Sequence, residues 1–138
     1  MSKLALPATM ACLLACSPAL ADDIGGATNI LCTVLETQVC LEAGGCVQIH
    51  PEDLNVPRFL RLDTGKKRLY TTSASGENRE TIADSIERAD GQLILQGVEA
   101  GRGYSLFIHE PSGQATFASA AEGRSATAFA ACTPAVDD

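Results

Sequence analysis

Four apolar segments separated by three short turns occupy residues 92–132, and no other feature of the chain restricts its fold as strongly. The segments are residues 92–99, 104–110, 114–120 and 125–132, and each intervening turn contains glycine. Apolar runs of roughly five to eight residues, bounded by turn residues at this spacing, are typical of antiparallel strands. In one run, Tyr104, Leu106 and Ile108 share one side of such a strand. The sequence therefore predicts an antiparallel meander in this part of the chain.

Further strands are predicted before this meander, at residues 29–36, 46–50, 58–63 and 67–72, and an Asp-Thr-Gly turn joins the last two. Residues 80–89 fit either a helical stripe or a strand. We predict a strand, because Ile82 and Ile86 share one face at a period of two and Asp90-Gly91 makes a tight turn. Residues 22–28 are polar and contain glycine, so we predict a loose leader there.

Large and small side chains alternate in the last two segments, where Phe117 and Phe129 each lie among alanines and serines. This alternation suits the inner side of a closed or strongly curled sheet. We predict an all-β fold, in which a single antiparallel meander of about eight strands makes a small up-and-down barrel or a nearly closed sheet. Because the chain is short and lacks Trp, we predict a filled interior rather than a ligand cavity.

The first residues have the pattern of a secretory signal. Lys3 provides a positive start, residues 4–15 are apolar, and a small-x-small motif ends at Ala21. We therefore predict a signal peptide at residues 1–21, a mature chain beginning at Asp22, and a periplasmic or secreted protein without a transmembrane segment. The alternative is a lipoprotein signal, in which Cys16 would carry a lipid anchor.

The mature chain would be a single domain at residues 22–138, with a disulfide-rich start at residues 29–57 and the meander at residues 58–134. It keeps Cys32, Cys40, Cys46 and Cys132, and an even number of cysteines in an exported domain indicates two disulfides. We favour the pairs Cys40–Cys46 and Cys32–Cys132, although spacing alone does not exclude the crossed pairings. The first three cysteines with His50 could also form a metal site, but an oxidising compartment favours disulfides, so we predict no metal and no cofactor.

The chain is acidic, with 10 Lys and Arg against 17 Asp and Glu, which gives a net charge of -7. Such a protein is repelled by phosphate backbones, so nucleic acid is not an expected partner. One predicted hairpin is nonetheless basic. Its charges would either dock an anionic glycan or an acidic protein, or protect an exposed strand edge from pairing with other chains. These residues are Arg58, Arg61, Lys66, Lys67 and Arg68.

No catalytic signature surrounds any serine, although His50 and His109 are available as bases. Glu99 and Glu110 could face each other across one hairpin as a pair of carboxylates. In an acidic protein such pairs arise by chance and serve solubility. We therefore predict that the chain is not an enzyme but an exported binding module with an unidentified protein or glycan partner.

The ending of the chain resembles that of a group of small exported bacterial proteins of unknown role. The shared features are a Gly-Arg-Gly-aromatic-Ser-Leu strand at residues 101–106, a glycine turn, and an aromatic-small-Ala-Cys-Thr close at residues 129–133. The resemblance covers roughly residues 30–134, and it implies the fold and export without implying an activity.

A second resemblance lies in the Ser-Ala-Ser-Gly segment at residues 73–76, which is similar to a segment of periplasmic inhibitors of C-type lysozyme. Those inhibitors are small disulfide-tied β-barrels in which this segment enters the lysozyme cleft. The resemblance implies an alternative function, lysozyme inhibition through Ser73, Ser75 and Gly76. The tyrosine that follows in the inhibitors has no counterpart here, where Glu77, Asn78 and Arg79 come next.

Overall fold

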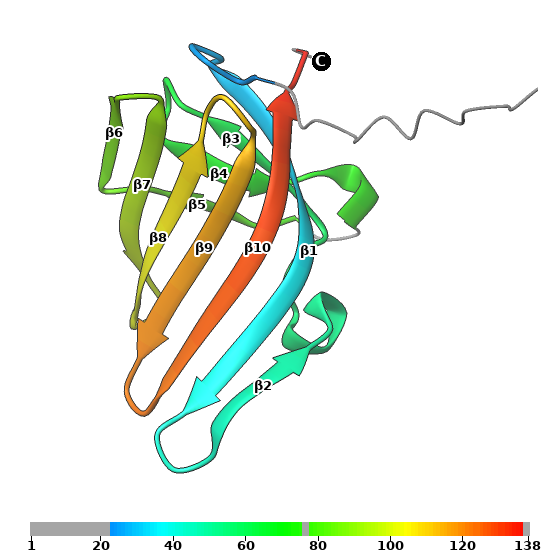
Figure 1. The fold of residues 1–138 in the computed structure, drawn as a ribbon, viewed down its shortest axis with the longest axis vertical. Helices are drawn as coiled ribbons and strands as arrows, with labels where there is room; N and C mark the ends of the chain where they lie inside the picture. The colour runs from blue at the N-terminus through cyan, green and yellow to red at the C-terminus, as the bar shows by residue number, and fades with distance from the viewer. Residues whose placement is uncertain (1–22, 76–77, 137–138) are drawn as a thin grey trace, which may run out of the picture.

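The computed structural model describes residues 23–75 and 78–136, which form one curled antiparallel sheet (Figure 1). The predicted signal peptide, the Cys16 alternative and the first mature residue, Asp22, lie outside the described residues. The predicted all-β class is confirmed, with ten strands in the described part rather than about eight. The strands are β1 (Asn29–Leu41), β2 (Gly45–Ile49), β3 (Phe59–Asp63), β4 (Arg68–Thr71), β5 (Glu80–Ile82), β6 (Ser85–Ala89), β7 (Gln92–Glu99), β8 (Arg102–His109), β9 (Gln114–Ala121) and β10 (Arg124–Pro134), with 3₁₀ turns η1 (Pro51–Leu54) and η2 (Ser73–Ser75).

The strand order is β5-β4-β3-β1-β10-β9-β8-β7-β6, with β2 paired only to the second half of β1. Apart from β2–β3 and β5–β6, the described strands that follow one another in the chain are neighbours, and the first long strand lies beside the last, as in an up-and-down barrel. The ladder is open between β5 and β6, so the sheet is a half-barrel. The chain crosses this opening at Ala83 and Asp84, whose amides donate to the carbonyls of Lys67 at 2.8 Å and Gln96 at 2.9 Å.

The crossing divides the strand predicted at residues 80–89 into β5 and β6. The prediction of strand rather than helix is confirmed, but the prediction that Ile82 and Ile86 share one face is wrong. Ile82 is 55% exposed, whereas Ile86 packs against the core. The reason is that Ala83 is buried in step with Thr81, and the inward-facing positions change from odd to even numbers only after the crossing, where Ile86 packs on the core.

The first strand is longer than predicted and contains a β-bulge in its ladder with β10. Leu35 has no partner on β10, because Val34 pairs with Ala130 and Glu36 pairs with Phe129. The extra residue shifts the inward-facing positions from even to odd numbers, so that Thr37 is buried. A period of two therefore fails in the middle of β1, and the strand continues to Leu41, beyond the predicted end at residue 36.

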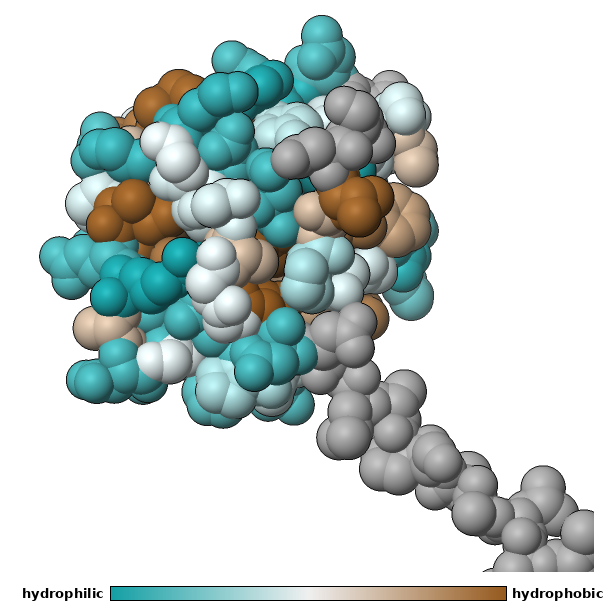
Figure 2. Space-filling model, turned by 90° about the horizontal axis from the view of Figure 1, so that it is seen from above, coloured by the Kyte–Doolittle hydropathy of each residue, from teal (hydrophilic) through white to brown (hydrophobic). Residues whose placement is uncertain are grey.

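The core fills the end of the half-barrel near the start of β1, and the N-terminal segment covers it. The prediction of a loose leader at residues 22–28 is wrong, because Ile24 is fully buried and its amide donates to the carbonyl of Glu110 at 2.9 Å. Arg88 also donates to the carbonyl of Ala27 at 2.7 Å. A single isoleucine among polar residues shows no periodicity, so the sequence does not reveal this cap. Seen from above, hydrophobic residues form separate small areas among hydrophilic ones (Figure 2).

Both favoured disulfides are present. Cys32 and Cys132 face each other on β1 and β10, and Cys40 and Cys46 face each other on β1 and β2, with Cα atoms 4.0 Å apart in each pair. Cross-strand register places the sulfurs within bonding reach. All four thiols are joined in these disulfides, so none of them is a free thiolate beside His50.

Candidate functional site

The prediction of a filled interior is wrong at the second end of the half-barrel, where a pocket of about 280 Å³ opens. The pocket lies at the Arg102 end of β8, and Ile24 covers the core beyond the other end of that strand, beside Glu110. Small inner side chains on the last two strands leave this space. They are Ser119, Ala121, Ala126 and Ala128.

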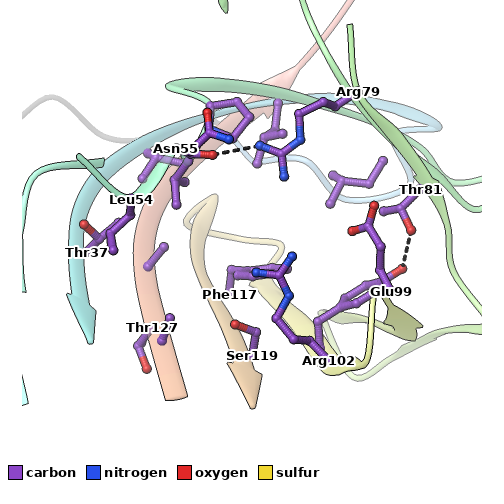
Figure 3. Close-up of a pocket in the computed structure, with 18 of the residues that line it drawn as sticks. Thr37, Leu54, Asn55, Arg79, Thr81, Glu99, Arg102, Phe117, Ser119 and Thr127 are labelled. Carbon is purple, nitrogen blue, oxygen red and sulfur yellow. Dashed lines mark hydrogen bonds between the residues drawn. The ribbon is translucent and has the colours of Figure 1, made fainter. Parts of the chain in front are cut away.

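The walls of the pocket are mainly apolar. Inner positions of the sheet supply one part, and the chain after η1 covers the side of the pocket (Figure 3). Tyr104 stacks on Phe117 with ring centroids 5.8 Å apart, and its hydroxyl lies 3.4 Å from the Thr81 hydroxyl. Other apolar lining residues are Val34, Val39, Leu54, Val56, Pro57, Leu60 and Leu69.

The mouth of the pocket is charged, because the inner-face positions at these strand ends hold ionisable residues. Glu99 and Arg102 are opposite each other in the strand register beside the turn of the β7–β8 hairpin, and Arg124 is the first residue of β10. In the described part of the chain, neither Arg102 nor Arg124 makes an ion pair through its side chain. Both are exposed to solvent. The mouth therefore presents guanidinium groups that no carboxylate of the described residues neutralises directly.

Arg79 braces the opposite side of the mouth. Its Nη1 donates to the carbonyl of Asn55 at 2.7 Å, and its backbone amide and carbonyl both bond the Thr71 hydroxyl. Figure 3 shows the Arg79 and Arg102 side chains reaching over the pocket from opposite sides, with Glu99 beside Arg102. Glu80 also lines the pocket, but its carboxylate is 2.6 Å from Arg68.

None of the basic hairpin residues lines the pocket, and acidic groups accompany most of them. Arg58 bonds Glu52 at 2.5 Å, and this hydrogen bond lowers the pKa of the Glu52 carboxyl. Lys66 lies 3.5 Å from Asp63, Lys67 donates to the Asp84 carbonyl at 3.3 Å, and Arg68 lies 4.3 Å over the Tyr70 ring. Arg61 stands opposite Tyr70 in the β3–β4 register. The structure thus distributes this charge among local partners.

The serine segment of the second resemblance forms η2. Ser73 is exposed, whereas the Ser75 hydroxyl donates to the Phe59 carbonyl at 2.8 Å and accepts from the Phe59 amide at 3.3 Å. Ser75 therefore fastens the segment to the start of β3. Gly76, the third residue of that hypothesis, lies outside the described residues.

The titratable residues singled out in the sequence do not assemble into a site. Glu99 and Glu110, which could face each other by sequence alone, lie at opposite ends of the β7–β8 hairpin. Glu110 is buried and lies 2.7 Å from Arg88. His109 Nδ1 is 2.8 Å from the Ser112 hydroxyl in an exposed turn. No group of three potential metal ligands occurs among residues 23–75 and 78–136.

The pocket residues were missed in the sequence. The signal that could have found them is the alternation of inward-facing residues in β7, β8 and β10. Every second residue of these strands faces the interior, and the last such positions at the strand ends are Glu99, Arg102 and Arg124.

In the described ranges, no helix is both long and apolar enough to cross a membrane. Compared with protein-family models, with curated proteins and with solved structures, the chain has no match.

Proposed function

We propose that the chain is an exported, non-catalytic binding module whose site is the pocket at the open end of the half-barrel, and that its ligand is a small, largely apolar molecule. The observation that carries the proposal is the hollow of about 280 Å³ behind mainly apolar walls, in a domain whose other end is closed and packed. Export is in keeping with the two disulfides.

The size and lining of the pocket fit such a ligand. Small-molecule sites usually begin at roughly 300 Å³ and combine apolar walls with a few polar groups. A cavity of roughly 150 Å³ with aliphatic and aromatic walls already admits benzene. The hydroxyl groups of Thr81 and Tyr104 provide polar atoms among the apolar walls.

The chemistry of the lining supports binding rather than catalysis. Among the described lining residues are hydroxyl groups, including Ser119 and Ser125, but no histidine, lysine or cysteine. Activation of a hydroxyl nucleophile needs a base within hydrogen-bond reach. The only carboxylates in this lining are Glu80, which is paired with Arg68, and Glu99, which stands at the mouth.

The proposal is tested by titration of the purified mature protein with N-phenyl-1-naphthylamine, a neutral apolar dye that fluoresces when it leaves water. The chain contains no Trp, so the protein contributes little background. We expect a saturable increase in fluorescence. Ala126→Phe, which places a large ring at a small inner position of the pocket, should abolish the increase.

A matched control is available on the same strand. Ala131→Phe adds the same ring on the opposite face of β10, outside the pocket lining. It should leave dye binding unchanged, and circular dichroism should show that both variants keep the sheet. Absence of saturable binding to the folded wild type, or equal binding by both variants, would remove the pocket as the site.

Lysozyme inhibition is the alternative proposal, and the exposure of Ser73 in η2 is the feature that supports it. It predicts that micromolar protein slows the clearing of a bacterial suspension by C-type lysozyme, and that Ser73→Lys removes the effect. Unchanged clearing by the folded wild type would retire this alternative without affecting the pocket proposal.

A further inference from the structure

We propose that the ligand of this pocket carries a carboxylate, and that Arg102 and Arg124 hold this group at the mouth while the apolar body lies inside. The inference rests on the proposed function, because it names the class of molecule that the same pocket accepts: a single-chain monocarboxylate of medium length.

The charges at the mouth favour an anion. The charged residues of the described lining are three arginines and two glutamates, and Glu80 is committed to Arg68 at 2.6 Å. Glu99 is then the remaining acidic group of this lining, against Arg102 and Arg124, which make no ion pair among the described residues. The charged side chains of this lining without a partner in the described ranges are thus two arginines and one glutamate, in a chain whose net charge is -7.

Arg102 is the residue best placed to contact the ligand. It begins β8 two residues before Tyr104, at an inner-face position, so its side chain continues the line of the apolar wall toward solvent. No ion pair joins it to Glu99 within the described part of the chain, although the two residues are opposite each other in the register. Figure 3 shows its guanidinium directed over the pocket.

The arrangement suits a molecule that has an anionic group at one end and an apolar body. A guanidinium group binds a carboxylate through two parallel hydrogen bonds. The walls behind it include Val34, Leu69 and Phe117, which gain from contact with hydrocarbon and offer little to a polar body. A purely polar anion would leave these walls wet, and a cationic amphiphile would meet the arginines.

The experiment is displacement of bound N-phenyl-1-naphthylamine by three molecules with straight ten-carbon chains: decanoate, decanol and decyltrimethylammonium. We expect decanoate to compete best with the wild-type protein. A charge-assisted hydrogen bond is worth about 1.5–3 kcal/mol, so Arg102→Gln should weaken decanoate about tenfold or more. The same variant should leave decanol unchanged, and Arg124→Gln should act in the same direction.

Two controls fix the sign of the effect. Glu99→Gln removes the acidic group at the mouth, so it should strengthen decanoate and weaken decyltrimethylammonium. Lys66→Gln removes one positive charge at the other end of the barrel, where the Thr64 amide donates to the Thr28 carbonyl at 2.8 Å. This variant should change the affinity for neither decanoate nor decyltrimethylammonium. Added salt should weaken decanoate and not decanol.

The outcomes separate the two proposals. Equal competition by decanoate and decanol, or an equal loss of both in Arg102→Gln, would overturn the carboxylate head while the apolar pocket stands. Stronger competition by decyltrimethylammonium would overturn it in favour of Glu99 as the recognising group. Failure of the dye itself to bind the folded protein would overturn the proposed function as well.

Discussion

Gly97 and Tyr104 face each other across the β7–β8 ladder, and the tyrosine ring occupies the space that a side chain at Gly97 would need. A Cβ atom on Gly97 would lie 2.5 Å from the Tyr104 hydroxyl oxygen and 2.7 Å from the ring carbon that carries it. The ring is buried and also stacks on Phe117. The absence of a side chain at Gly97 therefore sets the position of one wall of the pocket.

Gly97→Ala should push the Tyr104 ring toward the pocket, lower dye affinity at least about tenfold, and destabilise the fold by about 1–3 kcal/mol, the usual cost of overpacking. Dye titration and urea denaturation measure the two effects. Gly103→Ala is the matched control, because a Cβ there meets nothing within 4 Å. Equal behaviour of the two variants would contradict the packing argument.

The two disulfides should differ in their contribution to stability. Cys32–Cys132 closes a separation of 100 residues between buried cysteines, and Cys40–Cys46 closes a separation of 6. In the chain-entropy model these loops correspond to about 4.7 and about 2 kcal/mol. We expect Cys32→Ala/Cys132→Ala to lower the urea midpoint much more than Cys40→Ala/Cys46→Ala. A larger loss from the second pair would contradict this ranking.

Ile24 should be a major contributor to stability despite its place near the N-terminus. Its side chain is fully buried in the core cluster, so Ile24→Ala should cost about 2–5 kcal/mol in the free energy of unfolding. Ile82→Ala makes the same deletion where the side chain is 55% exposed, and it should cost less than about 1 kcal/mol. Urea denaturation compares them, and similar losses would show that the N-terminal segment does not cap the core in solution.

The buried carboxylate of Glu110 should depend on Arg88. The Arg88 side chain is 34% exposed and that of Glu110 is 6% exposed, with 2.7 Å between Nε and Oε1. Arg88→Met leaves a buried charge without its partner, and because water still reaches the site we expect a loss of about 2 kcal/mol. The double variant Arg88→Met/Glu110→Leu should recover most of it. Denaturation of the single and double variants supplies the test, and an additive loss would contradict the pairing.

Acid should remove a contribution to stability made by Asp63. The Lys66 backbone N–H donates to its Oδ1 at 2.9 Å, and this bond lowers the pKa of Asp63 below its ordinary value of 3.8. A lowered folded-state pKa means stability that is present above the unfolded-state pKa and is lost as the pH falls through the folded-state pKa. The difference in unfolding free energy between wild type and Asp63→Asn should therefore be constant near neutral pH and should vanish in acid.

NMR titration of the Asp63 carboxyl carbon reports that pKa directly. Lys66→Gln keeps the backbone N–H that is the largest cause of the lowering, so most of the shift should survive in this variant. A return of the pKa to 3.8 in Lys66→Gln would assign the effect to the lysine charge instead.

The alternation of apolar residues around Tyr104 and the turns that punctuate residues 92–132 determined the strands of the meander, because a half-buried strand must repeat every two residues. Spacing and context favoured the two disulfides without excluding the crossed pairings, and the ladder register, which places each pair directly opposite, decided between them. The same rule failed at Leu35, where a bulge changes the parity, and between Ala83 and Ile86, where the chain crosses the opening.

Tertiary structure alone decided where the barrel is full and where it is empty. Ile24 closes one end through contacts with residues far along the chain, and the space at the other end depends on how closely β1, β4, β8, β9 and β10 approach. A sequence gives the size of each side chain but not the distance from that side chain to the strand across the barrel. For this reason Arg102 and Arg124 appear in the sequence as ordinary turn residues, and only the curled sheet brings them to the mouth of one pocket.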